Sequence, residues 1–418
     1  MAAGLHRNTV LMALQLVLLG ASPALFVPLV IRIVGPETYA GIAVMQVVTG
    51  YLVVLVSYGF HLSGPAMMGR AATDAERAGI FWSALRAKLM LLALALCLFA
   101  LTFPLLGRPA GAQPHLAVFA LLLCAFAGNS VWYLQSLDRF APGALLAAAG
   151  AAVGILLLIS NAWMPPGTTA YAAVLALILP QVCVGAGSFA ATVPGLAPAR
   201  QAAVRIADTL RAEFPVFLSQ LAMLAYMSLG TLAVSFFHSP ETTAAYAAAE
   251  KLFNTGSVLL ATLYSAAYPR LAGVYHRDLD AYWRLNGKIL ALFVGLAAVG
   301  ELVLIAWPLP LLGVYVGADL APLIAPQLPL FGLWLASSIF GHMASGHLVI
   351  AGKRGTALRM TLGMAVLSAA AGLYLCRAQA GYWMAGMLLA QCLPLCLLLK
   401  AYMEMRTAQK KRRPTHPI

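Results

Sequence analysis

Long apolar segments recur along the whole chain, and only short polar connections separate them. As a helix, roughly 20 apolar residues are enough to cross the ~30 Å hydrocarbon core of a bilayer. Only 9% of the 418 residues are charged and 62% are hydrophobic, whereas a soluble domain carries about 25% charged residues. The chain is therefore predicted to be an all-α polytopic membrane protein without a separate soluble domain.

The apolar runs predict about twelve transmembrane helices, because each span with its connection uses roughly 35 residues. The expected helices lie near residues 9–33, 38–60, 84–107, 115–136, 143–164, 170–193, 214–237, 243–268, 286–306, 322–350, 360–376 and 379–402. The connections expected on the side away from the termini are 34–37, 108–114, 165–169, 238–242, 307–321 and 377–378. All are short, so they leave little room for an external catalytic site.

The positive charges predict the orientation. All of the 26 Lys and Arg residues except Arg32, Arg108, Lys251 and Arg377 are expected on one side. By the positive-inside rule this side is cytoplasmic, and both termini lie there. The basic tail (403–418) is interpreted as a topology anchor and a contact for anionic lipids. A nucleic-acid partner is not expected, since no basic face with interleaved aromatic residues lies outside the membrane.

An internal duplication is indicated by two similar segments, GPETYAG (35–41) and SPETTAA (239–245). LRAK (85–88) similarly matches LNGK (285–288). The matching residues include Pro, Glu, Thr, Gly and Lys, although chance matches are a rival explanation in a chain dominated by Ala and Leu. Parallel repeats predict two six-helix lobes around a central cavity. The expected parts are an N-terminal lobe (1–195), a cytoplasmic linker (196–213), a C-terminal lobe (214–402) and the basic tail.

Polar residues inside the expected spans are candidates for this cavity, because a charge at mid-bilayer costs roughly 2.5–3.5 kcal/mol on insertion scales. Glu250 and Lys251 are consecutive in the eighth expected helix. They differ by about 100° around the axis, so one is expected to pack while the other faces the cavity. Under the duplication, Gln46 of the second helix is equivalent to Glu250.

Three further charged residues lie nearer the expected helix ends. Arg32 and Glu37 flank the first external turn. They fit either a structural clasp between them or a functional role along a transport path. Glu301 lies near the end of the ninth expected helix, close enough to reach water.

Enzyme motifs and metal-site patterns are weak. AGKRGT (351–356) lacks the upstream glycine of a phosphate-binding loop, and Asp278-Leu-Asp280 lies on a short loop. His342 and His347 are five residues apart rather than the four that align two metal ligands on one helical face. The six cysteines read as packed apolar side chains. No enzymatic activity, metal or cofactor is expected.

A family resemblance rests on three segments. IRIVGPETYAGIAVMQVVTGYLVVLVSYGFHLSGPAMMGRAA (31–72) resembles the start of Wzx-type polysaccharide flippases, which are the oligosaccharide branch of the multidrug/oligosaccharidyl-lipid/polysaccharide exporter superfamily. AAYAAAEKLFN (244–254) and AAYPRLAG (266–273) are similar to the same family. The resemblance spans the chain in length and layout, but its specific motifs cover only these segments.

The resemblance implies a bacterial inner-membrane protein that moves an undecaprenyl-diphosphate-linked oligosaccharide between leaflets by alternating access. Arg32 and Lys251 are the expected cations for the diphosphate. Gln46, Tyr51 and Asn254 are the expected polar cavity residues. If an ion gradient drives transport, Glu250 is the first coupling candidate, followed by Glu37 and Glu301. Polysaccharide polymerase or assembly proteins are the partners that the family implies.

Two alternatives remain open. A multidrug or cation antiporter of the same superfamily shares the expected fold, although cationic substrates favour an acidic cavity. A membrane polysaccharide polymerase or ligase acts on the same lipid-linked sugars, but that reading calls for a large external loop with Arg and His. Neither the transported glycan nor the oligomeric state follows from the sequence.

Overall fold

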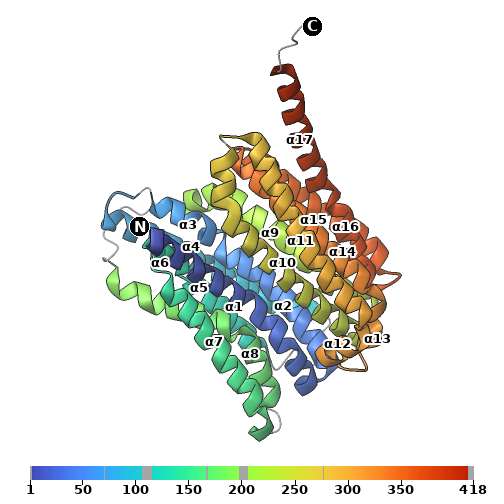
Figure 1. Cartoon of the computed structure of the whole chain (residues 1–418). Coiled ribbons are helices and arrows are strands. Elements are labelled where there is room, and N and C mark those ends of the chain that lie inside the picture. Colours follow the sequence, from blue (N-terminus) through green and yellow to red (C-terminus); the bar gives the residue numbers. More distant parts are fainter. Residues whose placement is uncertain are drawn as a thin grey trace.

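The protein is helical throughout the described part of the chain. The computed structural model describes residues 2–69, 71–105, 115–165, 168–196, 206–275 and 277–412 (Figure 1). The N-terminal half contains α1 (Ala2–Val34), α2 (Pro36–Ser57), α3 (Phe60–Met68), α4 (Asp74–Leu105), α5 (Leu116–Gly128), α6 (Val131–Ser136), α7 (Ala141–Ser160) and α8 (Thr169–Thr192). The C-terminal half contains α9 (Ile206–Phe237), α10 (Pro240–Tyr275), α11 (Leu279–Ala306), α12 (Pro308–Val316), α13 (Ala321–Ile324), α14 (Leu328–Ile350), α15 (Arg354–Cys376), α16 (Trp383–Ala390) and α17 (Cys392–Arg412).

The polytopic all-α class expected from the sequence is confirmed. Within the described ranges, eleven helical segments are long and apolar enough to cross a membrane. The eighth expected span, α10, is not one of these eleven, because Glu250, Lys251 and Asn254 make it more polar than its neighbours. It nevertheless packs against α1, α2, α9, α11 and α14. A long helix with two charged residues near its middle therefore lies inside the bundle.

The connections after α6, α10 and α14 carry the basic residues Arg139, Arg277 and Lys353, and Arg77 lies in the first turn of α4, just after the α3–α4 connection. We call this end of the bundle, where both termini also lie, the basic end. The α1–α2, α7–α8, α9–α10 and α15–α16 connections lie at the opposite end. In Figure 1, α17 projects beyond the bundle at the basic end.

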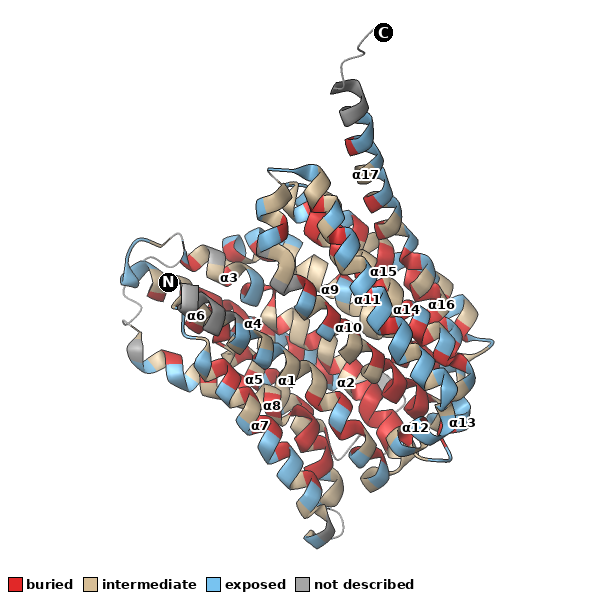
Figure 2. Ribbon diagram, viewed as in Figure 1, coloured by how far each residue is buried: buried red, intermediate tan, exposed pale blue. Residues whose placement is uncertain are grey.

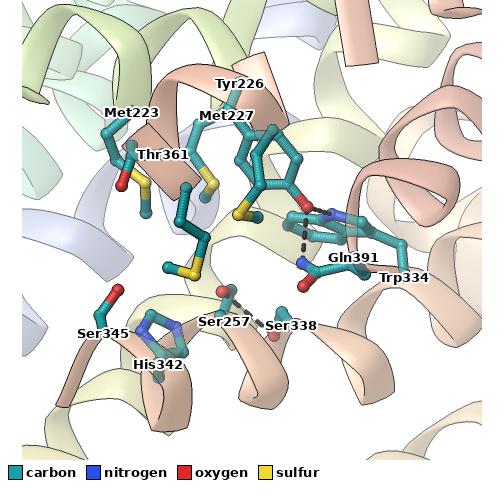
Figure 3. Close-up of a pocket in the computed structure, with 13 residues that line it drawn as sticks. Met223, Tyr226, Met227, Ser257, Trp334, Ser338, His342, Ser345, Thr361 and Gln391 are labelled. Carbon is teal, nitrogen blue, oxygen red and sulfur yellow. Dashed lines mark hydrogen bonds between the residues drawn. The ribbon is translucent and has the colours of Figure 1, made fainter. Parts of the chain in front are cut away.

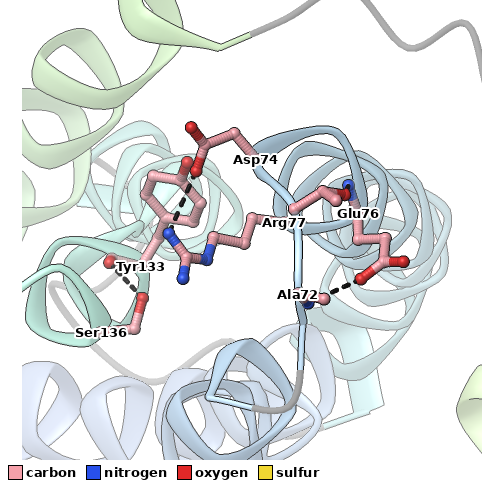
Figure 4. A network of polar contacts seen from close by, with 7 residues as sticks. Ala72, Asp74, Glu76, Arg77, Tyr133 and Ser136 are labelled. Atoms are coloured by element: carbon pink, nitrogen blue, oxygen red, sulfur yellow. Dashed lines mark hydrogen bonds and ion pairs between the residues drawn. The ribbon is translucent and has the colours of Figure 1, made fainter.

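Several expected helix boundaries are wrong, because polar first turns are invisible to an apolar pattern. The fourth helix begins at Asp74, not near 84. Thr73 Oγ1 accepts the Glu76 N–H at 3.2 Å, and Glu76 Oε2 accepts the Ala72 N–H at 2.8 Å. The two bonds resemble a capping box, except that Glu76 accepts from the residue before the N-cap Thr73. Arg77 adds an ion pair with Asp74 at 3.1 Å (Figure 4).

Four other segments differ from the expected helix boundaries. Asp278 caps α11 by accepting the Ala281 N–H at 2.9 Å, so this helix begins at Leu279 rather than near 286. The first carboxylate of Asp278-Leu-Asp280 is thus a helix cap. Residues 206–213 of the expected linker are the start of α9, and 403–412 of the expected tail continue α17. The connection expected at 307–321 forms α12 and the start of α13. The expected connection 108–114 lies outside the described residues.

The core runs along the contact between the two halves (Figure 2). There α1 and α2 pack against α10, and α2 and α4 pack against α9. Residues 244–249 of α10 are each at most 1% exposed. Five of these six residues are alanine, and small side chains allow membrane helices to approach closely. A helix with Glu250 and Lys251 is thereby held between the halves. The division into two lobes at the residues given above stays a prediction.

Close helix contacts also depend on glycine, and Gly185 offers a test. A Cβ at Gly185 of α8 would lie 2.3 Å from the Ala125 carbonyl oxygen of α5. Gly185→Ala is therefore expected to destabilise the protein by about 1–3 kcal/mol, because backbone has to move. The matched control is Gly295→Ala in α11, where the added Cβ meets nothing within 4 Å. The melting temperature of the purified protein in detergent should fall for Gly185→Ala only. An equal effect of both substitutions would contradict this packing.

Candidate functional site

The contact between α2 and α10 brings together two of the residues selected from the sequence. Lys251 Nζ of α10 donates a hydrogen bond to Gln46 Oε1 of α2. The same ammonium lies 5.7 Å from the centroid of the Tyr39 ring, within range of a cation–π interaction. A cation thus bridges the two halves through an amide and an aromatic face rather than through a carboxylate. The contact partner of Gln46 is thus Lys251, the residue after the one that the duplication makes equivalent to Gln46.

Glu250 faces away from α2 and into the C-terminal half. Its Oε2 accepts the Thr231 hydroxyl of α9 at 2.6 Å, and its Oε1 accepts the Tyr246 hydroxyl at 3.3 Å. The residue is 4% exposed, and its carboxylate forms no ion pair with any residue in the described ranges. Neighbouring acid and base therefore point to different helices instead of neutralising each other.

Two polar residues near Lys251 have hydrogen-bonding capacity to spare. Asn254, one turn further along α10, donates to the Met227 carbonyl of α9 at 3.1 Å. Its Oδ1, like the Tyr51 hydroxyl of α2, is buried and finds no hydrogen-bond partner in the described part of the chain. Buried polar atoms of this kind are rare in proteins, and each calls for an explanation such as a ligand or water.

Arg32 lies at the opposite end of the bundle. Its Nη2 donates to the Val314 carbonyl of α12 at 2.7 Å. The expected clasp with Glu37 is wrong, since the two do not form an ion pair, and Glu37 is exposed in the first turn of α2. The guanidinium reaches α12 because 307–321 is helical rather than an open connection. Tyr315 adds a second link, donating from its hydroxyl to the Ala24 carbonyl of α1 at 3.0 Å.

Glu301 lies between α11 and α14. Both of its carboxylate oxygens are buried, and neither has a hydrogen-bond partner among the residues that the structure describes. The carboxylate occupies the space beside Gly332, where an added Cβ would overlap it. The sequence suggested that Glu301 reaches water at the helix end, but the structure buries its oxygens against α14.

A cavity of about 470 Å³ opens in the N-terminal half towards the basic end. Its polar lining consists of Gln15, Ser57, His61, Lys88, Asn129, Gln135 and Gln220. These side chains come from α1, α2, α3, α4, α6 and α9 and from the break between α5 and α6. Amides are the commonest polar side chains of the lining, and amides can both donate to and accept from sugar hydroxyls.

Lys88 is the cation of this cavity, and the sequence analysis missed it. Its side chain is 4% exposed and donates to the Asn129 carbonyl at 2.9 Å. That carbonyl is available because α5 ends at Gly128 and α6 begins only at Val131. We counted Lys88 among the cytoplasmic charges because the helix start was placed too late. With α4 beginning at Asp74, Lys88 lies about 21 Å along the helix.

The C-terminal half has a smaller cavity, of about 50 Å³ (Figure 3). The Tyr226 hydroxyl at its edge accepts hydrogen bonds from Trp334 Nε1 at 2.8 Å and Gln391 Nε2 at 2.7 Å. These bonds connect α9, α14 and the α16–α17 junction. Four methionines and His342 line the space. The 470 Å³ cavity and the buried Lys88 thus lie in the N-terminal half, and the space beside Tyr226 in the C-terminal half is much smaller.

Comparison with known proteins supplies the remaining findings. The sequence profile of a family described as "Polysaccharide biosynthesis protein" matches residues 5–274. A protein of Shigella dysenteriae named "Putative O-antigen transporter" is 25% identical over 259 residues, which are 60% of this chain and 63% of that protein. This chain therefore aligns with less than two thirds of the length of that relative.

Two solved structures share the fold. The inward-facing conformation of a multidrug resistance MATE family transporter of the MOP superfamily has a TM-score of 0.75 at 16% identity, covering 94% of this chain and 96% of that one. The lipid II flippase MurJ in its inward closed conformation has a TM-score of 0.73 at 11% identity, covering 96% of this chain and 87% of that one. The fold expected from the resemblance is confirmed.

Proposed function

Since the chain belongs to the polysaccharide biosynthesis protein family, we propose that it is a flippase for lipid-linked oligosaccharides. Its substrate is an undecaprenyl-diphosphate-linked oligosaccharide used to build a surface polysaccharide such as O-antigen, capsule or exopolysaccharide. The protein moves this molecule across the bacterial inner membrane, and no covalent bond is made or broken. The name of the Shigella dysenteriae relative supports this substrate class.

The observation that carries this proposal is the buried Lys88 in a cavity that also has four amide side chains in its wall. A diphosphate must leave water to cross the membrane, so it needs a cation on its route. Lys88 is held by a carbonyl and not by a carboxylate, so its positive charge is available to an anion. Gln15, Gln135 and Gln220 surround it with groups suited to sugar hydroxyls. The polyprenyl tail stays in the lipid, and only the headgroup enters the cavity.

The positive-inside rule places the basic end in the cytoplasm. Headgroups then load from the cytoplasm, because the 470 Å³ cavity lies towards that end. The opposite end is closed by the Arg32–Val314 and Tyr315–Ala24 hydrogen bonds, both of which connect α1 to α12. Release to the periplasm requires these two links to break. The guanidinium of Arg32 is then free to meet the diphosphate at the exit.

Lys251 occupies the contact that must rearrange between these two states. Its bond to Gln46 joins α2 to α10, and separation of the halves exposes both groups to the headgroup. Tyr51 and Asn254 add the unpartnered polar atoms described above. Glu250 is the first candidate for ion coupling, with Glu37 and Glu301 as alternatives. Partners, if present, are the polymerase and assembly proteins of the same pathway, and no cofactor is required.

Reconstitution into sealed vesicles with a lipid-linked oligosaccharide tests the proposal. The measured quantity is the rate at which the headgroup becomes accessible on the far leaflet. Movement that depends on the wild-type protein supports a flippase. Absence of movement, together with export of a small organic cation, would identify an antiporter instead.

Arg32→Ala provides a prediction in the same assay. The substitution removes the Val314 hydrogen bond at the closed end and a cation at the exit. We expect the rate to fall roughly two- to tenfold, the effect of about one hydrogen bond on a conformational or binding step. Arg377→Ala is the control, since Arg377 lies at the same end and stacks on Phe237 within the C-terminal half. An unchanged rate for Arg32→Ala would show that Arg32 has no role in transport.

A further inference from the structure

A third cavity lies at the basic end of the C-terminal half, far along the sequence from the proposed transport residues. It has a volume of about 400 Å³ and lies between the end of α14, the start of α15 and the middle of α17. Its polar lining consists of His347, Lys353, Thr356, Lys400 and Glu404. Leucine and alanine side chains complete the wall. The site thus combines cations with an apolar surface at one end of a membrane bundle.

The AGKRGT segment, unassigned in the sequence, forms the turn beside this cavity. Gly352 has a φ of +74°, which a residue with a side chain rarely adopts. The turn is fixed by two hydrogen bonds, from the Gly352 N–H to the Val349 carbonyl at 3.1 Å and from the Lys353 N–H to the Leu348 carbonyl at 2.7 Å. Lys353 then directly precedes α15 and lines the cavity.

His347 forms a buried part of the wall and is 9% exposed. Its Nδ1 shares a hydrogen bond of 3.1 Å with the Tyr282 hydroxyl. The rings of Tyr275 and Trp283 pack against the imidazole, with centroids 5.7 Å and 5.4 Å away. An imidazole with one nitrogen fixed by Tyr282 keeps a second nitrogen for another partner. A polar group is therefore held in place at the inner wall of the cavity.

The charges favour an anion. Lys353 and Lys400 supply two positive charges against the single carboxylate of Glu404. Lys400 and Glu404 are 4.0 Å apart, with side chains 71% and 59% exposed. An ion pair this open to solvent contributes little to stability, so Lys400 can leave Glu404 and bind a phosphate instead. Two ammonium groups, a hydroxyl and an imidazole are donors suited to phosphate oxygens.

We propose that this cavity binds the phosphate of an anionic membrane phospholipid. The lysines hold the headgroup, and the leucines of α14 and α17 contact the first part of its acyl chains. A phosphate between Lys353 and Lys400 would join the α14–α15 turn to α17, the helix that projects from the bundle (Figure 1). The inference requires only that the protein spans a membrane, and it is independent of the transported substrate.

Lipid-dependent thermal stability and native mass spectrometry of the purified full chain test the site. The probes are phosphatidylglycerol, phosphatidylcholine and inorganic phosphate. We expect phosphatidylglycerol alone to raise the melting temperature and to remain bound. In Lys353→Ala/Lys400→Ala the apparent affinity for phosphatidylglycerol should fall about tenfold or more, because each lysine near an anionic lipid surface contributes about 1 kcal/mol to binding. Glu404→Gln should raise the affinity, since it releases Lys400.

The control is Arg277→Ala/Lys288→Ala, which removes two exposed positive charges from the basic end outside the cavity and should keep the wild-type response. Lys353→Gln/Lys400→Gln repeats the test if the alanine variant fails to fold. Wild-type affinity in the cavity variants would overturn the proposal and assign lipid binding to the basic tail. An equal response to inorganic phosphate would overturn the lipid assignment, and an equal response to phosphatidylcholine would overturn the role of charge.

Discussion

Lys88→Met is expected to slow translocation of a lipid-linked oligosaccharide in sealed vesicles by at least about tenfold. Methionine retains the apolar stem that packs in α4 but removes the one lysine or arginine found among the described residues that line the 470 Å³ cavity. Removing a charge that contacts an oppositely charged partner out of water costs roughly 2–5 kcal/mol, and 1.4 kcal/mol already corresponds to a tenfold change. The initial rate of headgroup appearance on the far leaflet is the readout.

Two further variants separate charge from structure. Lys288→Ala is the matched control, because LNGK (285–288) corresponds to LRAK (85–88) but Lys288 is exposed on α11. It should transport at the wild-type rate. Lys88→Arg retains the positive charge and should recover part of the activity lost in Lys88→Met. If Lys88→Met transports normally while remaining folded, the headgroup takes another route.

Glu250→Gln is expected to remove any response of transport to an imposed proton or sodium gradient. The carboxylate is buried with two hydroxyl donors, from Thr231 and Tyr246. A carboxylate so placed in a membrane protein can be neutralised by binding a cation, and breaking that cycle uncouples transport from the gradient. Glutamine keeps one oxygen acceptor, and the hydroxyl that faces its amide N–H can accept instead of donating, so the packing of α9 on α10 should persist.

The measurement compares translocation rates with and without the gradient in wild-type and variant vesicles. Glu37→Gln and Glu301→Gln test the two alternative carboxylates. Glu37→Gln is expected to keep the gradient response, because Glu37 is exposed in the first turn of α2. An unchanged gradient response in Glu250→Gln would end the coupling hypothesis for this residue. Loss of the response in Glu301→Gln instead would transfer the role to the unpartnered carboxylate between α11 and α14.

The membrane-spanning helices could be predicted because a helix in lipid must be long and apolar, and such apolar segments are easy to recognise in the sequence. The starts of the helices could not be predicted from hydropathy. Thr73 and Glu76 define the start of α4, and Asp278 defines the start of α11, through single hydrogen bonds that a hydropathy pattern does not reveal. The resulting error was large for Lys88. A helix thought to begin near 84 places this lysine in its first turn at the surface, whereas one that begins at Asp74 carries it deep into the bundle.

The candidate site was only partly predictable for a related reason. Lys251 and Gln46 were identifiable because polar side chains stand out within apolar helices. Their mutual contact was not, since it depends on how α2 and α10 are rotated against each other. The partner of Arg32 could not be found either, because the Val314 carbonyl is a backbone group that any residue supplies. The capping-box pattern TDAE (73–76) was the one available signal for the depth of Lys88.

The break between α5 and α6 has a consequence for the energetics of the proposed transport. Because the Asn129 carbonyl, and not an acidic side chain, holds Lys88, the lysine's charge is fixed to the protein and is not cancelled. A diphosphate that leaves this lysine crosses the bilayer without a counter-charge travelling beside it. Each elementary charge moved through 100 mV corresponds to about 2.3 kcal/mol. In a cell whose interior is electrically negative, the membrane voltage itself would then push the headgroup outward.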